Sequence, residues 1–263
     1  VDYRVLDGDT AQPEVWQKLD RLLAEDWPHQ SGGSLPIRVL CIDSGYATQE
    51  VYSWVRNHPQ AVWGGAGARA SQPRTVVAIK GRDSDTSLIL SVSKADTGGK
   101  RRGLRVWNVS GPVAKTELYR WLKLPRLTDE ERERGEIEPP GSCHFPEYGE
   151  QYFKQLTAER RVIRIHKGFP RATWEKDPTR NNEALDCRVY SRAAASIYGL
   201  DRFTDRQWQK MRDAIESLPI EQVDQGEQVA VSTTYPAVEA PQPNKTKPMF
   251  KQRATAVADD PYL

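Results

Sequence analysis

The stretch that decides the fold is Ile37-Arg38-Val39-Leu40-Cys41-Ile42-Asp43-Ser44-Gly45, followed by Ala47-Thr48-Gln49-Glu50-Val51-Tyr52-Ser53-Trp54-Val55. Apart from its arginine, the run before Asp43 is apolar and partly β-branched, which is typical of a buried parallel strand. The second segment has helical spacing. Open α/β sheets present polar groups at the carboxyl ends of their strands through this order of strand, acid, glycine turn and helix. The stretch therefore predicts an α/β fold with Asp43 at the edge of its sheet.

Asp43 by itself does not establish a functional site. Aspartate and serine are common in turns, so Asp43 could simply cap the turn that links the strand to the helix. The alternative is that Asp43 supplies a carboxylate to a site at the sheet edge. That interpretation needs a second acid from elsewhere in the chain.

Two further acids lie in the run Asn182-Glu183-Ala184-Leu185-Asp186-Cys187-Arg188-Val189-Tyr190, which continues into an alanine-rich stretch and predicts a helix with one buried face. Glu183 and Asp186 are three residues apart, so their side chains share a helix face. A half-buried carboxylate must be paired, protonated or bound to a cation, so a metal site is one interpretation. The other is structural, because Arg180 and Arg188 could pair with these acids and Glu183 could complement the helix dipole.

Hydrophobic periodicity predicts the other elements. Alternating or continuous apolar runs predict strands at 1–6, 76–79, 87–92, 104–109 and 162–165. Helical spacing predicts helices at 13–25, at 48–57, from Pro112 onward and near 204–218. The charged segment 128–138 is predicted to be a solvent-facing loop.

Several segments resemble the motifs of one known family, in the right order over roughly residues 1–200. The motifs are Cys41-Ile42-Asp43-Ser44-Gly45 at a strand end, Ile79-Lys80-Gly81 ("IKG"), Pro112 to Tyr119 ("AK…Y"), His144-Phe145-Pro146 ("HFP"), Leu156-Thr157-Ala158-Glu159 ("LTAE"), and Trp174 with Asn182 to Tyr190 ("W…NEALDC"). The family is the lambda-like, or GpA, large terminase subunit, which packages DNA into tailed phage heads. The last motif is the most specific of the set.

The resemblance implies an RNase H-like nuclease fold, an α/β fold with a mixed central sheet flanked by helices. Residues 1–218 are expected to form this domain. Residues 219–263 are rich in Gln, Pro, Thr, Val and Lys without periodicity, and are expected to form a flexible C-terminal tail. The family's first acid belongs to an early strand with a "DVQ"-like motif that this chain does not contain, so the fold is expected to lack its first strands here.

The same resemblance assigns the candidate site. Asp43 and Asp186 match two of the family's three acidic positions and are the expected catalytic residues and metal ligands, with Glu183 as an auxiliary acid. Carboxylates holding two divalent cations promote phosphodiester hydrolysis, and Mg²⁺ or Mn²⁺ suits an all-oxygen site. Lys80, at a strand end, is expected to face the scissile phosphate, although it could also be a solvated strand terminus. Lys115, on a helix, is not assigned to the site.

Basic residues gather in two stretches that could follow DNA phosphates. The first, expected to bind DNA, surrounds a glycine turn and contains Lys94, Lys100, Arg101, Arg102 and Arg105. The second contains Arg160, Arg161, Arg164, Lys167 and Arg171. A solvated hairpin tip would also be basic, so composition alone leaves both interpretations open.

Composition sets limits on these hypotheses. The net charge of +2 neither requires nor excludes a nucleic-acid partner. Three widely spaced cysteines without a CxxC pair indicate free thiols in a reducing compartment, here the host cytoplasm. No apolar run is long enough to span a membrane. The P-loop motif GxxxxGK[ST] is absent, so ATP hydrolysis is not expected of this chain.

The resemblance therefore predicts a metal-dependent endonuclease that cuts concatemeric viral DNA during genome packaging. Double-stranded viral DNA, the terminase small subunit and the portal protein are the implied partners. An alternative is a non-catalytic DNA- or portal-binding module that keeps the fold without a complete set of acids. A generic RNase H-like resolvase or transposase is a third interpretation, and the "NEALDC" and "IKG" motifs argue against it.

Overall fold

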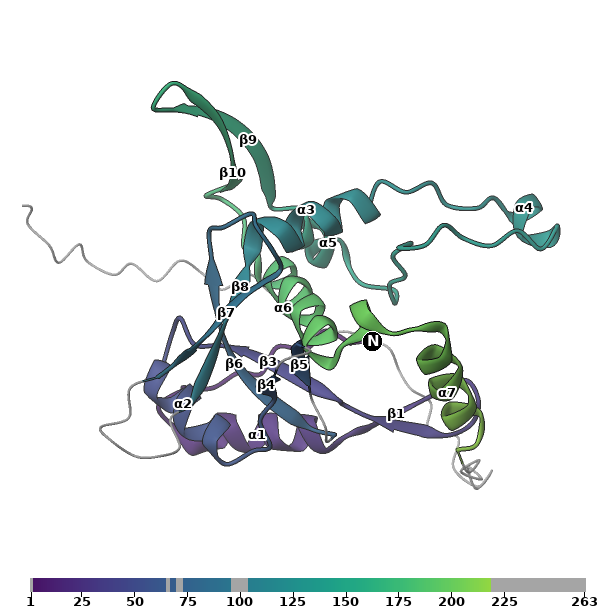
Figure 1. Ribbon diagram of the computed structural model, residues 1–263, viewed down its shortest axis with the longest axis horizontal. Helices are drawn as coiled ribbons and strands as arrows, with labels where there is room; N and C mark the ends of the chain where they lie inside the picture. The colour runs from purple at the N-terminus through teal and green to yellow at the C-terminus, as the bar shows by residue number, and fades with distance from the viewer. Residues whose placement is uncertain (1, 65–66, 70–72, 96–103, 219–263) are drawn as a thin grey trace, which may run out of the picture. The chain divides into compact units, whose positions relative to one another are not determined.

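The fold is built around a four-stranded mixed sheet in the order β3-β6-β8-β7 (Figure 1). The computed structural model describes residues 2–64, 67–69, 73–95 and 104–218. The sheet strands are β3 (Val39–Asp43), β6 (Thr75–Arg82), β8 (Arg105–Ser110) and β7 (Ile89–Lys94). β3, β6 and β8 are parallel, and β7 joins β8 in antiparallel orientation. The predicted mixed central sheet flanked by helices is confirmed.

Helices and three small antiparallel sheets surround this centre. The helices are α1 (Pro13–Ala24), α2 (Thr48–Arg56), α3 (Gly111–Trp121), α4 (Asp129–Glu133), α5 (Glu150–Leu156), α6 (Glu183–Tyr198) and α7 (Asp205–Glu216), with a short 3₁₀ helix at Leu200–Arg202. The small sheets pair β1 (Asp26–Pro28) with β2 (Ser34–Pro36), β4 (Val62–Gly64) with β5 (Gly67–Arg69), and β9 (Glu159–His166) with β10 (Phe169–Lys176).

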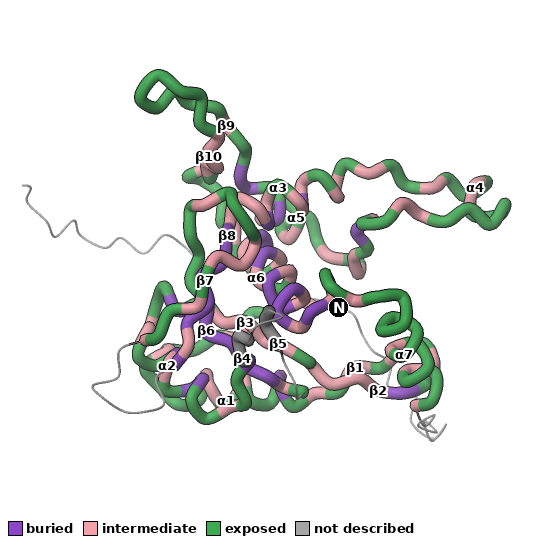
Figure 2. The backbone as a smooth tube through the Cα atoms, in the orientation of Figure 1, coloured by how far each residue is buried: buried purple, intermediate pink, exposed green. Residues whose placement is uncertain are grey.

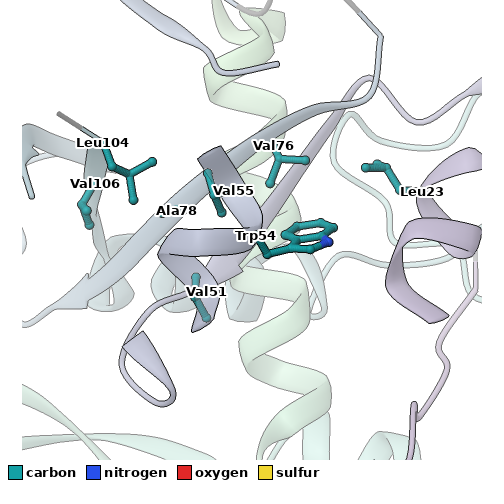
Figure 3. Packing of buried hydrophobic residues seen from close by; sticks show 8 residues of the cluster. All are labelled: Leu23, Val51, Trp54, Val55, Val76, Ala78, Leu104 and Val106. Atoms are coloured by element: carbon teal, nitrogen blue, oxygen red, sulfur yellow. The ribbon is translucent and has the colours of Figure 1, made fainter. Parts of the chain in front are cut away.

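One face of the central sheet packs against α1 and α2. Side chains alternate between the two faces along a strand, so Val76 and Ala78 of β6 point to the same side. The cluster on that side also takes in Trp54 and Val55 of α2 and Leu23 of α1 (Figure 3). These side chains are at most 7% exposed. Because these side chains are buried on this side, they determine which residues of the parallel strands point toward α1 and α2.

The other face of the sheet packs against α6. Val77 and Ile79 of β6 form a buried cluster with Ala193 and Ile197, which lie in the second half of that helix. The first half of α6 packs instead against α3 and α5, where Leu185 joins a third cluster. α6 therefore runs from the sheet to α3, and its first turns lie where these elements meet.

Three of the predicted segments differ from the structure. The charged segment 128–138 was predicted to be a loop, but it contains the short helix α4. Residues 1–6 alternate in the manner of a strand, but residues 2–6 are not paired with any strand in the described chain, so that prediction was wrong. The predicted strand at 162–165 is part of a longer hairpin, because β9 pairs along its whole length with β10, which was not predicted. The other predicted helices and strands within the described chain are present within a few residues of their expected bounds.

The described residues, from 2 to 218, belong to a single compact unit. The predicted tail, 219–263, lies outside the described residues. All three cysteines are free thiols, as expected. Among the helices that the structure describes, none has the length and apolar character needed to cross a membrane.

Candidate active site

The parallel strands β3, β6 and β8 all end at one edge of the sheet, and Asp43 is the last residue of β3. The next residue, Ser44, is fully buried, and both its backbone N–H and its hydroxyl donate to the carbonyl oxygen of Ile79, at 2.9 and 2.8 Å. Gly45 N–H donates to Asp43 Oδ1 at 2.9 Å. These bonds hold the Asp43 carboxylate at the strand end.

Glycine at position 45 leaves the Asp43 carboxylate its room. A Cβ atom on Gly45 would lie 3.3 Å from Asp43 Oδ1, which is closer than ordinary van der Waals contact. The Asp43-Ser44-Gly45 turn therefore both links the strand to the helix and holds the exposed Asp43 carboxylate in place.

Strand alternation aims Asp43 at α6. Val39, Cys41 and Asp43 share one face of β3, and the first two contact the cluster that contains the second half of α6. Asp43 completes this arrangement by accepting a hydrogen bond at Oδ2 from the hydroxyl of Tyr190 on α6, at 3.1 Å. Burial and the negative charges of Asp43 and Asp186 raise the pKa of the Tyr190 phenol, so it remains a hydrogen-bond donor at neutral pH.

Asp186 lies one helical turn before Tyr190 and is half-buried. Burial raises the pKa of its carboxyl group above the usual value of 3.8, and the nearby negative charges of Glu159, Asp43 and Glu183 raise it further. The Lys115 ammonium acts in the opposite direction. The Asp43 charge is thus among those that act on Asp186, while the predicted convergence of the two acids around a metal stays a prediction.

A buried ion pair is connected to Asp186 through the side chain of Asn182. Lys115 Nζ on α3 donates to both carboxylate oxygens of Glu159, at 2.8 and 2.7 Å, and Glu159 is only 7% exposed. The side-chain amide of Asn182, just before α6, donates to Glu159 at 2.9 Å and to Asp186 Oδ2 at 3.2 Å. The amide thus links the ion pair to the candidate catalytic acid.

Sequence reasoning missed Glu159, Asn182 and Tyr190 as parts of this site, and it left out Lys115. The "LTAE" motif spans the end of α5 at Leu156 and the start of β9 at Glu159. The signal was nevertheless present, because all four residues lie in segments quoted as family motifs. Only the fold shows that these segments meet.

Lys80 is at the same sheet edge but on the other face. Alternation along β6 groups Lys80 with Val76 and Ala78, which point toward α2, whereas Gly81 faces α6. A Cβ atom on Gly81 would lie 3.6 Å from the Tyr190 hydroxyl. Lys80 is exposed, and no ion pair involving it is found in the described chain. Its ammonium is not part of the carboxylate cluster but is free to reach an anion bound at the edge.

Glu183 occupies an exposed position in the first turn of α6, and its influence on Asp186 is the weakest of the three acids. Across the residues that the structure describes, no three histidine, cysteine, aspartate or glutamate side chains gather closely enough to form a metal site. The predicted set of Asp43, Asp186 and Glu183 is therefore not assembled as a three-ligand group.

Of the basic residues expected to bind DNA, the structure describes Lys94 and Arg105. β7 ends at Lys94 and β8 begins at Arg105, and the two are directly paired. Asp43 is level with Ile79 of β6 and Trp107 of β8, so Arg105 lies two residues before that level, two strands away from β3. Lys100, Arg101 and Arg102 lie outside the described residues. The DNA-binding role of this stretch stays a prediction.

The fold and the site together define a class: an α/β domain with an aspartate at the edge where its parallel strands end, hydrogen-bonded to a helix that carries a second aspartate. The chain belongs to the family described as terminase large subunit gpA, endonuclease domain, whose model matches residues 1–208.

Two curated relatives are similar to this chain. It is 26% identical over 197 residues to the terminase large subunit of Enterobacteria phage P21 and 23% identical over 201 residues to that of Escherichia phage lambda. Each match covers 75% of this chain and 28% of the relative, so the chain spans under a third of their length. No solved structure shows significant similarity to it.

Proposed function

We propose that this chain is the nuclease region of a phage terminase large subunit, and that it hydrolyses phosphodiester bonds of viral DNA during genome packaging. The family and the two phage relatives support this role. The observation that carries the proposal is the hydrogen bond from Tyr190 to Asp43, because it joins the strand-end acid to the helix that bears Asp186.

The proposed fold is RNase H-like. Its support is a mixed sheet whose first described strand ends in an acid, together with a helix that brings a second acid to the same edge. The proposed partners are double-stranded viral DNA, the terminase small subunit and the portal protein, and the proposed location is the host cytoplasm. All of these follow from the family.

The donor atoms fit Mg²⁺ or Mn²⁺, which prefer oxygen ligands and are often held by one or two carboxylates together with substrate phosphates. Asp43 and Asp186 would hold the cation, with Glu183 as an auxiliary acid nearby. A bound divalent cation would supply charge neutralisation at the cleaved phosphate and acidify a water molecule. The pKa of Asp186 is raised first by burial and then by neighbouring negative charges, and a bound cation would relieve that repulsion.

The remaining residues position these two acids. Tyr190 and Gly45 N–H orient the Asp43 carboxylate from two sides. Asn182 orients Asp186, and the ion pair between Lys115 and Glu159 fixes the amide of Asn182 in turn. Lys80 is proposed to contact the scissile phosphate.

The alternative function is a non-catalytic DNA- or portal-binding module. The observation on its side is that, among the described residues, no three histidine, cysteine, aspartate or glutamate side chains gather closely enough to hold a metal ion.

A plasmid-nicking assay with Mn²⁺ separates the two functions. The full-length protein would be compared with Asp43→Asn and Asp186→Asn, and with Asp213→Asn as a matched control on exposed α7. The proposal predicts a loss of about 100-fold or more for the two site variants, since metal stabilisation of the transition state is worth several kcal/mol. Unchanged cutting by both site variants would reject it. DNA binding without any cutting by the wild type would support the alternative.

A further inference from the structure

The β9–β10 hairpin leaves the candidate site as an exposed two-stranded arm (Figures 1 and 2). It forms its own small sheet, separate from the central one. β9 starts at Glu159, inside the site, and every residue from Ile163 to Arg171 is exposed. Eight-residue strands extend about 25 Å at roughly 3.3 Å per residue.

The base of this arm is fixed to the site. Tyr119 on α3 donates a hydrogen bond to the backbone carbonyl of Glu159 at 2.5 Å, and its ring contacts that of Trp174 on β10 with centroids 4.9 Å apart. The Glu159 carboxylate is held by Lys115, also on α3. The arm therefore starts from a defined position next to Asp186.

The strand register gives the arm two different faces, because directly opposed residues share a face. The basic face consists of the pairs Arg160/Glu175, Val162/Thr173, Arg164/Arg171 and His166/Phe169. The other face, called the apolar face, consists of the pairs Glu159/Lys176 and Arg161/Trp174 toward the base and Ile163/Ala172 and Ile165/Pro170 toward the tip. Three arginines and one glutamate leave the basic face with a net positive charge.

Arg164 and Arg171 stand directly opposite each other on the basic face. Like charges on directly opposed residues destabilise a strand pair, so this arginine pair does not contribute to the stability of the hairpin. Arg164 donates to Glu175, which is the only acid on that face, at 2.6 Å. Arg171 has no ion pair in the part of the chain that the structure describes. An anion lying along this face would relieve the repulsion.

The tip of the arm is a tight turn that carries another cation. Lys167 and Gly168 both have positive φ values, 51° and 82°, which is the pattern of a two-residue type I′ hairpin turn. A residue other than glycine rarely adopts this conformation. The turn nevertheless keeps an exposed lysine at the tip.

We infer that the β9–β10 hairpin is a DNA-gripping arm whose basic face, Arg160, Arg164 and Arg171, lies along the phosphates of the duplex that enters the Asp43–Asp186 site. A two-stranded ribbon fits the major groove of a DNA duplex, and arginine suits phosphate contacts. This inference rests on the proposed nuclease function, because it takes its substrate from it.

The test measures DNA binding without cutting. The full-length protein would be titrated onto a short fluorescent duplex in EDTA, at salt concentrations between about 50 and 200 mM. The Arg160→Ser/Arg164→Ser/Arg171→Ser variant is expected to bind more weakly, and its slope of log affinity against log salt is expected to fall in magnitude by about 2 to 3, since each phosphate contact contributes about 0.9. An unchanged slope would overturn the inference.

Two matched controls separate this result from a general loss of charge or shape. Arg206→Ser/Lys210→Ser/Arg212→Ser removes three cations from exposed α7 and is expected to leave the slope unchanged. Ile163→Thr/Ile165→Thr changes the apolar face alone and is also expected to leave it unchanged. If the apolar-face variant loses DNA binding and the basic-face variant does not, the inference is contradicted, and the apolar face is the one that contacts a partner.

Two single variants keep the test decisive if the triple variant does not fold. Arg171→Ser is expected to lower the slope by about one. Glu175→Gln removes the only acid of the basic face and is expected to tighten binding. No change in binding for either variant would count against the arm.

The experiments distinguish failure of the proposed nuclease function from failure of the proposed DNA-binding role of the arm. If Asp43→Asn and Asp186→Asn cut normally while Arg171→Ser loses its salt slope, the catalytic assignment fails and the arm stands. If the acid variants are inactive while the basic-face variant binds DNA as the wild type does, the arm fails and the catalytic assignment stands.

Discussion

The phenol of Tyr190 donates a hydrogen bond to Asp43 Oδ2 at 3.1 Å across 147 residues of sequence, and so joins α6 to the carboxyl end of β3. Tyr190 follows Asp186 by one helical turn. The strand-end acid is thereby aligned with the helix acid before any substrate or cation is bound.

Tyr190→Phe removes this bond while keeping the ring in place. Because Asp43 is exposed, the cost in folding stability is expected to be below about 1 kcal/mol. The kcat of nicking is expected to fall about tenfold, because the bond to a charged group is worth roughly 1.5 kcal/mol and the carboxylate loses its orientation. The KM for DNA is expected to stay the same. Steady-state nicking kinetics check this split, and an unchanged kcat would remove Tyr190 from the positioning role.

The ion pair between Lys115 and Glu159 is expected to behave as a buried unit. Its side chains are 15% and 5% exposed. Lys115→Met alone leaves a buried carboxylate without its cation and is expected to cost about 3–5 kcal/mol of unfolding free energy. Lys115→Met/Glu159→Leu is expected to cost less than Lys115→Met. Urea unfolding of Lys115→Met, Glu159→Leu and the double variant measures these losses of unfolding free energy. A double variant whose loss equals the sum of the two single-variant losses would contradict the expectation.

Lys80→Met is expected to show the opposite combination. Lys80 is exposed and has no ion pair in the described chain, so the midpoint of thermal unfolding is expected to remain within about 1 °C of the wild type. Cutting is expected to fall about tenfold if its ammonium contacts the scissile phosphate, since charge-assisted hydrogen bonds are worth about 1.5–3 kcal/mol. Full activity in the nicking assay would reduce Lys80 to a solvated strand end.

The raised pKa of Asp186 predicts a pH dependence of stability in the metal-free protein. Because the folded state holds this proton more tightly than the unfolded state, stability is lost as pH rises from about the ordinary value of 3.8 through the raised pKa. Asp186→Asn lacks this loss and is expected to gain stability relative to wild type over that window.

Urea unfolding in EDTA at a series of pH values gives the difference between the two proteins and cancels the other carboxyl groups. Asp213→Asn serves as the exposed control. A difference between wild type and Asp186→Asn that does not change with pH would show that the Asp186 carboxyl is not perturbed by its surroundings.

The sequence predicted the central sheet because β6 and β8 are buried along most of their length. Ile37 to Asp43 and Val76 to Ile79 are largely apolar runs that end abruptly in polar residues. Such runs can be recognised as strands from the local sequence alone. The β9–β10 hairpin was only half predicted, since its distal residues pack against nothing and β10 contains Pro170 and polar residues. Exposed strands carry a weaker hydrophobic signal than buried ones.

Within the site, the two acids could be predicted from their segments and the residues that position them could not. Asp43 and Asp186 are marked by a strand end and a helix face, which are local patterns. The contacts of Glu159 with Lys115 and Asn182 join three elements, and their formation depends on how α3 and α6 pack. Lys80 shows the converse, because its motif marks the correct edge but strand alternation turns it to the other face.

The central claim is that Asp43 and Asp186 act as one site. A double-mutant cycle in the Mn²⁺-dependent nicking assay, with Asp43→Asn, Asp186→Asn and the double variant of the full-length protein, tests it most directly. The account predicts that each single change lowers cutting by about 100-fold or more and that the double variant is no slower than the singles, because residues that act as a unit are strongly non-additive. Losses that multiply in the double variant, or single variants that cut like the wild type, would contradict it.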